Sequence, residues 1–232
     1  MMDKNQIFEV LSSFHLFNDL SDAKLKKIAN NCQFQEFPKS SVIFGRNDFP
    51  HGFYILAKGQ LKLAVSSQDG VEKVIDIIFP GDSFGEAALF LESKFPACIE
   101  ATVDAQILMI PREIIIHLLD NDALLAQKML KKISIRNHQL INSIEMLSLQ
   151  SCTQRFIGYL LQMSADFSCT ENLRLPTSKR ILASLLNLSP ETLSRTINKL
   201  ETASLIKIKG NNVTLIDVAK LRKFGNSELS FH

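Results

Sequence analysis

The sequence predicts an α+β protein made of three consecutive parts, and three patterns lead to this prediction. Short runs rich in Ile, Val, Phe and Leu alternate with turn residues over 34–110, which is typical of a small β-sandwich or barrel. An apolar repeat with helical spacing follows, and after it come two capped helices with a strand, a turn and a strand. The predicted parts are residues 1–119, 120–150 and 151–232.

The composition is that of an ordinary globular protein, with 46% hydrophobic and 22% charged residues in a chain of 232. No apolar run approaches the roughly 18 residues of a membrane-spanning helix, and the start, MMDKNQIFEV, lacks the apolar segment of a signal peptide. The sequence therefore predicts a cytoplasmic protein with no membrane partner.

Four cysteines are scattered along the chain without close pairing: Cys32, Cys98, Cys152 and Cys169. This spacing fits reduced thiols. Because no C-x-x-C pair is present, we expect no metal site and no iron–sulfur cluster.

Charge is distributed unevenly. Residues 1–150 hold 15 Lys and Arg against 18 Asp and Glu, whereas residues 151–232 hold 11 against 6. A basic C-terminal third on a slightly acidic body indicates a polyanionic partner there, although charge alone also fits a scatter of solvated side chains.

The first part begins with residues 3–31, which predict one or two short helices. The predicted strands are 42–44, 53–57, 61–65, 74–79 and 106–110. Asp69-Gly70, between two of these runs, has the signature of a hairpin turn.

The long helix, predicted from about Asp120 to Leu147, carries a heptad seam. Its members are Ala123, Ala126, Leu130, Ile133, Asn137, Leu140, Ile144 and Leu147. Such a seam favours a parallel two-stranded dimer in which the polar Asn137 fixes the register. The alternative is a long helix packed on its own β-domain. Residues 148–151 break the pattern and predict a hinge.

The third part predicts a helix–turn–helix followed by a wing. Its first helix begins after Thr177 or Ser178, either of which is a good N-cap. Residues 187–189 form a tight connection, and Ser189 caps the second helix. Residues 205–216 then predict a strand, a turn and a strand.

The second helix is suited to reading DNA, because its apolar residues share one face and leave polar ones outside. In the major groove Arg195 can bond both acceptors of a guanine, and Glu191 can accept from a cytosine amino group. Lys199 and the start of the first helix are placed to hold phosphates. The predicted DNA-binding residues are Thr177, Ser178, Lys179, Arg180, Ser189, Glu191, Thr192, Ser194, Arg195 and Lys199. The alternative for Glu191 and Arg195 is a surface ion pair.

Two motifs are similar to those of a known family. FPGDSFGEAALF (79–90) resembles the pocket motif of the CRP/FNR family of bacterial transcription regulators, and ETLSR (191–195) resembles its recognition helix. The resemblance covers nearly the whole chain. It implies a cyclic-nucleotide-binding-like β-roll, a long dimerisation helix and a winged helix–turn–helix. The implied partners are a second copy of the chain, double-stranded DNA with TTGAT-like half-sites in an inverted repeat, and RNA polymerase.

The resemblance also implies an effector pocket, formed by Phe84, Gly85, Glu86, Pro96 and Ala97. In cyclic-nucleotide members an Arg followed by Ser or Thr neutralises the phosphate, but the matching positions here are Pro96 and Ala97. A bound phosphate would face Glu86 with no compensating cation, and an unpaired buried charge costs several kcal/mol. We therefore expect no cAMP binding.

Residues 14–21, 84–101 and 137–149 are similar to the DNR-like and HcpR-like branch of the family, which responds to nitrogen oxides. This resemblance implies nitric oxide as the signal and haem as the cofactor, with His138 or His15 as the axial ligand. Each histidine also fits an ordinary surface role.

Two other functions compete with an effector-gated regulator. A regulator with a vestigial pocket would bind DNA at all times. An enzyme is disfavoured, because the sequence has no nucleophile elbow, P-loop, metal quartet or dinucleotide fingerprint.

Overall fold

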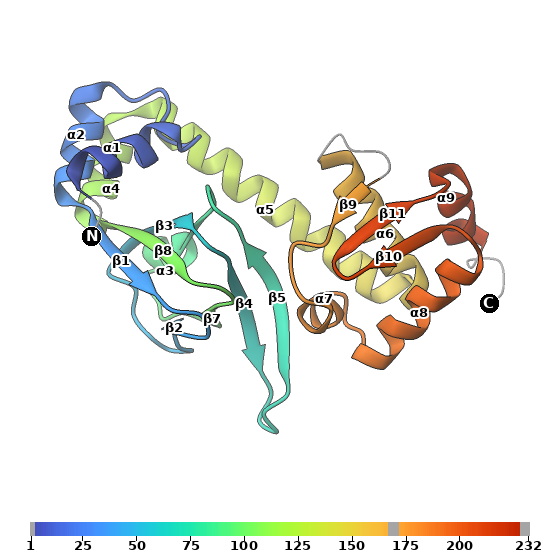
Figure 1. Cartoon of the computed structure of the whole chain (residues 1–232). Helices are drawn as coiled ribbons and strands as arrows, with labels where there is room; N and C mark the ends of the chain where they lie inside the picture. Colours follow the sequence, from blue (N-terminus) through green and yellow to red (C-terminus); the bar gives the residue numbers. More distant parts are fainter. Residues whose placement is uncertain (1–2, 167–171, 228–232) are drawn as a thin grey trace. The chain divides into compact units, whose positions relative to one another are not determined.

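The computed structural model describes residues 3–166 and 172–227, and the chain divides into two compact units, residues 1–136 and 137–232. The division falls inside one long helix, α5 (Ala123–Leu149), so this helix contributes to both units (Figure 1). No helix within the described ranges is long and apolar enough to cross a membrane.

The N-terminal unit contains two antiparallel four-stranded sheets, with strand orders β1-β8-β3-β6 and β2-β7-β4-β5. The strands are β1 (Gln33–Phe37), β2 (Val42–Phe44), β3 (Gly52–Lys58), β4 (Leu61–Ser66), β5 (Glu72–Ile78), β6 (Ser83–Phe84), β7 (Cys98–Ala101) and β8 (Ala105–Pro111). The five predicted strands are confirmed as β2, β3, β4, β5 and β8. The prediction missed β1, β6 and β7, which are polar or short.

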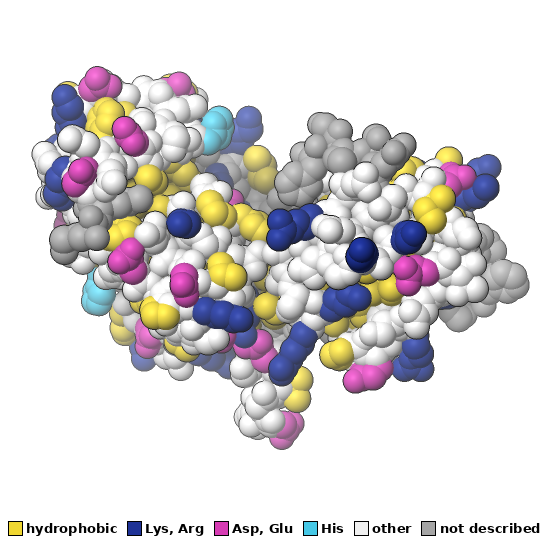
Figure 2. Space-filling model, in the orientation of Figure 1, with side chains coloured by type: hydrophobic (Ala, Val, Ile, Leu, Met, Phe, Trp, Pro, Cys, Tyr) yellow, Lys and Arg dark blue, Asp and Glu magenta, His cyan; other side chains and the backbone are white. Residues whose placement is uncertain are grey.

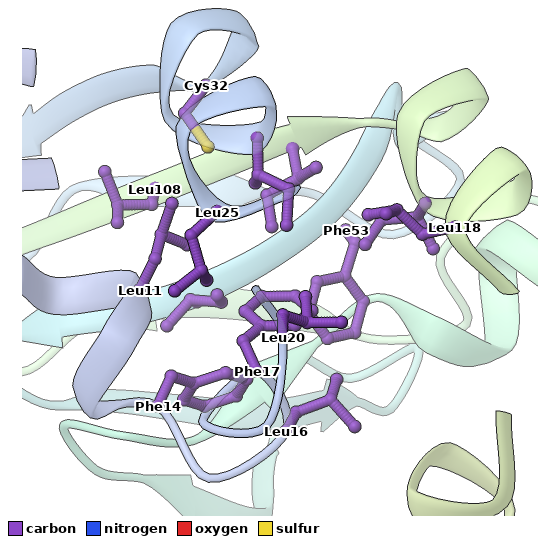
Figure 3. Close-up of a cluster of buried hydrophobic side chains, with 14 of the residues drawn as sticks. Leu11, Phe14, Leu16, Phe17, Leu20, Leu25, Cys32, Phe53, Leu108 and Leu118 are labelled. Atoms are coloured by element: carbon purple, nitrogen blue, oxygen red, sulfur yellow. The ribbon is translucent and has the colours of Figure 1, made fainter. Parts of the chain in front are cut away.

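The central strands β3 and β8 are buried on both faces. Successive side chains of a strand point to opposite sides, so each of these strands contributes to two cores. Tyr54 and Leu56 face the core between the two sheets. Phe53 and Ile55 instead join a cluster formed with α1 (Lys4–Ser13), α2 (Asp22–Asn31) and α4 (Arg112–Asn121) (Figure 3). The two predicted N-terminal helices are thereby confirmed as a cover on one sheet.

Helix α5 begins at Ala123 rather than near Asp120, because α4 extends to Asn121 and Asp122 separates the two helices. The Asp122 carboxylate accepts a hydrogen bond from the N–H of Leu125 at 3.0 Å, which gives α5 a capped start. A break occurs where residues 148–151 predicted one, but it is shorter: Ser148 and Leu149 are still helical, and only residues 150 and 151 separate α5 from the next helix.

The C-terminal unit packs helices against a three-stranded sheet with strand order β10-β11-β9. Its elements are α6 (Cys152–Asp166), β9 (Asn172–Arg174), α7 (Lys179–Leu185), α8 (Pro190–Thr202), β10 (Ile206–Lys209), β11 (Asn212–Leu215) and α9 (Val218–Ser227). The predicted wing is confirmed as the β10–β11 hairpin, which pairs Lys209 with Asn212. Strand β9 was not among the predicted strands, and it adds to the wing through β11.

Candidate functional sites

The helix–turn–helix is fixed at its helix starts by two serine caps. The Ser178 hydroxyl accepts from the N–H of Ile181 at 3.3 Å, so α7 begins after Ser178 and not after Thr177. The Ser189 hydroxyl accepts from the N–H of Thr192 at 3.1 Å and caps α8. Both caps satisfy backbone donors that have no partner inside the helix.

Helix α8 has one buried and one exposed face, as expected. Leu193, Ile197 and Leu200 are buried, and Thr196, which the sequence reasoning did not assign, joins them. The predicted base-reading residues lie on the other face: Glu191, Ser194, Arg195 and Lys199 are all exposed. The core of the unit thus holds the helix while leaving this face open.

The alternative of a Glu191–Arg195 ion pair finds no support, because no such pair occurs among the described residues. The pKa of Glu191 is lowered mainly by its own backbone N–H and by the Ser189 hydroxyl, and less by Arg195. At neutral pH the carboxylate is therefore charged and able to accept hydrogen bonds. The Ser194 hydroxyl donates to the carbonyl of Pro190 at 2.9 Å.

Most of the predicted phosphate-binding residues are also accessible. Ser178, Lys179 and Arg180 are exposed, and Figure 2 shows Lys and Arg side chains, in dark blue, recurring over the visible face of the C-terminal unit. The Lys199 ammonium lies 5.4 Å from the ring centre of Phe224, so this aromatic contact competes with its predicted phosphate role. Thr177 is a correction: only 5% of it is exposed, so its hydroxyl cannot reach a phosphate.

Sequence reasoning missed Arg155, a buried arginine on α6. Its guanidinium Nη1 donates to the carbonyls of Leu186 and Asn187, at 2.9 and 3.2 Å. These carbonyls lie in the turn between α7 and α8. No local pattern marks the residue, because it lies 31 positions before Leu186 in the chain.

Two residues of the predicted effector pocket, Phe84 and Ala97, are buried. Phe84 is buried and stacks on Tyr54, with ring centres 5.3 Å apart. Gly85 has φ 90°, and an added Cβ would lie 3.0 Å from the Tyr54 ring, so this position requires glycine. Ala97 is buried, whereas Pro96 is exposed. A cavity of about 290 Å³ lies instead on the side of α3 (Glu86–Leu91) that carries Leu89.

We expected no cation near Glu86 to compensate a bound phosphate, and this expectation is wrong. Lys132 of α5 places its ammonium 3.0 Å from the Glu86 carboxylate, and the Ser83 hydroxyl contacts both groups. The same ammonium lies 5.7 and 6.0 Å from the rings of Phe14 and Phe53. Lys132 was not found from sequence because it lies 46 positions after Glu86.

Lys132 belongs to a row of three cations on one side of α5, which we name the basic stripe: Lys128, Lys132 and Arg136. Lys128 pairs with Asp19 and Arg136 pairs with Asp76. Residues four apart lie on the same helix face, so the stripe attaches α5 to three separate segments of the N-terminal unit: the loop after α1, the pocket and β5.

Seven of the eight predicted seam residues on α5 are exposed, and Ala126 is half-buried. The exposed ones are Ala123, Leu130, Ile133, Asn137, Leu140, Ile144 and Leu147. The buried residues of the helix are Leu125 and Met129 instead. The side of α5 that packs on the N-terminal unit is therefore a different one, and the seam is uncovered in the single chain.

Neither predicted haem ligand is enclosed. The rings of His15 and His138 are both exposed, so the single chain does not present a built haem site around either one. Cys32 is buried, and burial raises the pKa of its thiol to about 12, which makes it unreactive at neutral pH. Cys169 lies outside the described residues, and within the described ranges no group of three or more His, Cys, Asp or Glu is arranged to hold a metal ion.

Two family descriptions match the chain and together cover more than half of it. Residues 34–122 match the cyclic nucleotide-binding domain, and residues 154–224 match the Crp-like helix-turn-helix domain. These matches correspond to the two-sheet unit and to the helix–turn–helix with its wing.

Similar proteins are regulators. The anaerobic regulatory protein of Pasteurella multocida is 25% identical over 79% of this chain and 68% of its own length. The CRP-like cAMP-activated global transcriptional regulator of Mycobacterium tuberculosis is 20% identical over 93% of this chain and 98% of its own length. The structure of DNR from Pseudomonas aeruginosa is 28% identical, with a TM-score of 0.51, and covers 97% of this chain and 100% of its own.

The fold and the exposed α8 face define a DNA-binding transcription regulator with a cyclic-nucleotide-binding-like β-roll and a winged helix–turn–helix. More particularly, the chain belongs to the CRP/FNR family of transcription regulators.

Proposed function

We propose that the protein is a homodimer that reads TTGAT-like half-sites in an inverted repeat and acts with RNA polymerase in the cytoplasm. The observation that carries this proposal is the α8 face, where Glu191 and Arg195 are exposed on a helix whose other side is buried. Arg195 matches the two acceptors of a guanine and Glu191 the amino group of a cytosine. Each good bidentate contact contributes about 1–3 kcal/mol of discrimination.

The uncovered seam on α5 supports the homodimer. Its apolar members are exposed in the single chain and repeat at heptad spacing around Asn137. A two-fold dimer would place its two recognition helices about 34 Å apart along the duplex, which matches an inverted repeat.

Base reading is tested by Arg195→Ala, with Arg222→Ala as the matched control, since Arg222 is an exposed arginine of α9 outside the α8 face. Binding to labelled duplexes is measured by fluorescence anisotropy at one salt concentration. Arg195→Ala is expected to lose about 5–150-fold of affinity for the repeat and to lose its preference at one guanine. Arg222→Ala is expected to keep that preference. An unchanged preference in Arg195→Ala would contradict the assigned role.

We further propose that an effector other than cAMP binds in the β-roll and shifts the dimer between two states that it binds unequally. Two observations support this: Pro96 and Ala97 supply no charge for a phosphate, and Lys132 is already paired with Glu86. Isothermal calorimetry with cAMP is expected to show no saturable heat. Micromolar affinity for cAMP would refute the proposal that the effector is another molecule.

Haem with nitric oxide is the candidate effector that the DNR-like resemblance implies. The purified protein is titrated with haem, and visible absorption is recorded before and after nitric oxide. A sharp band that saturates at one haem per chain, shifts with nitric oxide and disappears in His138→Ala or His15→Ala supports this effector. A broad band that does not saturate rules it out.

A constitutive regulator with a vestigial pocket is the second candidate. The observation that favours it is that the pocket groups have partners within the chain, Phe84 on Tyr54 and Glu86 on Lys132. It predicts the same operator affinity with and without a small-molecule extract of the cells, whereas a gated regulator changes its affinity.

A further inference from the structure

The buried guanidinium of Arg155 lies at the turn that connects α7 to α8. The residue is only 8% exposed. Its Nη1 donates to the carbonyls of Leu186 and Asn187, and its Nη2 lies 3.5 Å from the sulfur of Cys152. Among the residues that the structure describes, no carboxylate pairs with it. The backbone of the turn is therefore its main partner.

This turn is short and has a defined geometry. The N–H of Leu188 donates to the carbonyl of Ala183 at 2.8 Å, and the N–H of Asn187 donates to that of Ser184 at 3.1 Å. With Asn187 at φ 56°, these bonds form the Schellman ending of a helix. Ser189 then caps α8 directly. The direction of α8 therefore depends on a few backbone angles in this turn.

The Leu186 carbonyl belongs to the C-cap of α7, lacks a partner inside the helix and shares the partial negative charge of the helix end, and the Asn187 carbonyl follows it directly in the turn. A buried arginine is nevertheless costly, and its Nε has no hydrogen-bond partner among the described residues. An apolar side chain would fill the space without this cost. The contact with the turn therefore explains the residue better than packing does.

We propose that Arg155 is a positioning residue for DNA recognition. By bonding the carbonyls of Leu186 and Asn187, it sets the direction of α8 and so the aim of Glu191 and Arg195 at the bases. This proposal rests on the base reading by α8 proposed above. Both hydrogen bonds come from Nη1, whose two N–H groups have directions fixed by the plane of the guanidinium, whereas a lysine offers a point charge with freely rotating donors.

The first test is local and needs no DNA. Amide hydrogen exchange is followed in the full-length protein for the wild type, Arg155→Met, Arg155→Lys and Val213→Ala, a buried control in β11. In Arg155→Met the N–H groups of Leu188 and Thr192 are expected to exchange at least tenfold faster relative to the buried Leu221 N–H of α9, and Arg155→Lys is expected to restore part of the protection. Unchanged relative rates in Arg155→Met would overturn the proposal.

The second test measures recognition. A duplex that the wild type selects from a random pool is compared with a scrambled duplex of equal length, at a temperature where every variant is folded. Arg155→Met is expected to reduce the ratio of the two affinities at least tenfold with little change for the scrambled duplex, while Arg155→Lys recovers part and Val213→Ala keeps the ratio. A ratio retained by Arg155→Met refutes the positioning role. A selected duplex without a TTGAT-like repeat would refute the proposed half-site and leave the comparison of variants valid.

Discussion

Replacing Ile144 with alanine is expected to weaken the proposed dimer strongly. Ile144 is 65% exposed in the single chain. Full burial of an isoleucine contributes about 1.5–3 kcal/mol, so covering the exposed part contributes about 1–2 kcal/mol per chain and about twice that in a symmetric seam. Alanine retains a small share of this area. We expect a loss of about 1.5–3 kcal/mol, which corresponds to roughly a 10–150-fold rise in the dimer Kd.

The matched control is Ile135→Ala. Ile135 lies on the same helix and is 50% exposed, but it is not a member of the seam. Sedimentation equilibrium over a wide range of protein concentrations gives the dimer Kd of each variant. Ile135→Ala is expected to match the wild type. Equal Kd values for Ile135→Ala and Ile144→Ala would refute the assignment of the seam, and so would a wild type that stays monomeric throughout.

Two further predictions concern the stability of the N-terminal unit. Lys132→Met leaves the 18%-exposed carboxylate of Glu86 with the Ser83 hydroxyl but without a cation, and is expected to lower the free energy of unfolding in urea by about 1–3 kcal/mol. Adding Glu86→Gln should recover part of this loss, and strictly additive effects would argue against the pair. Because burial raises the pKa of Cys32 from 9.0 to about 12, its neutral thiol contributes stability that is complete below pH 9 and is lost as the pH rises towards 12. Between pH 8 and pH 10 the wild type should lose about 1.4 kcal/mol more than Cys32→Ala, and parallel pH curves would contradict this.

Local sequence patterns predicted the elements in which each face is uniformly buried or uniformly exposed. The runs that became β3 and β8 were evident because both of their faces are buried. The exposed face of α8 followed from the spacing of Leu193, Ile197 and Leu200. Strand β1, QFQEF, could not be predicted in this way, because it is mostly exposed and owes its conformation to pairing with β8.

The spacing of residues in the sequence could not predict contacts between segments that lie far apart in the chain. Glu86 looked unpaired because its partner comes from α5, and Arg155 looked like an ordinary helix residue because the turn that it holds comes later in the chain. Thr177 was assigned to phosphate binding because it lies at the start of the first helix, but packing in the folded unit buries it. In each case the prediction considered only the neighbours of a charged group or hydroxyl in the sequence, whereas its environment in the structure is formed by residues distant in sequence.

The basic stripe on α5 has a mechanical consequence. At about 100° per residue, its three cations and the seam point in directions about a third of a turn apart on the same rod. If an effector displaced the Lys132 ammonium from Glu86, α5 would lose one of the three ion pairs that fix its rotation about its own axis, and Lys128 and Arg136 would be left to resist a roll. A roll of about 20° at a side-chain radius of about 5 Å moves each seam residue sideways by roughly 2 Å. A displacement of this size would alter the side-chain packing of the proposed dimer seam. Lys132 would in this way couple the effector pocket to dimerisation through α5.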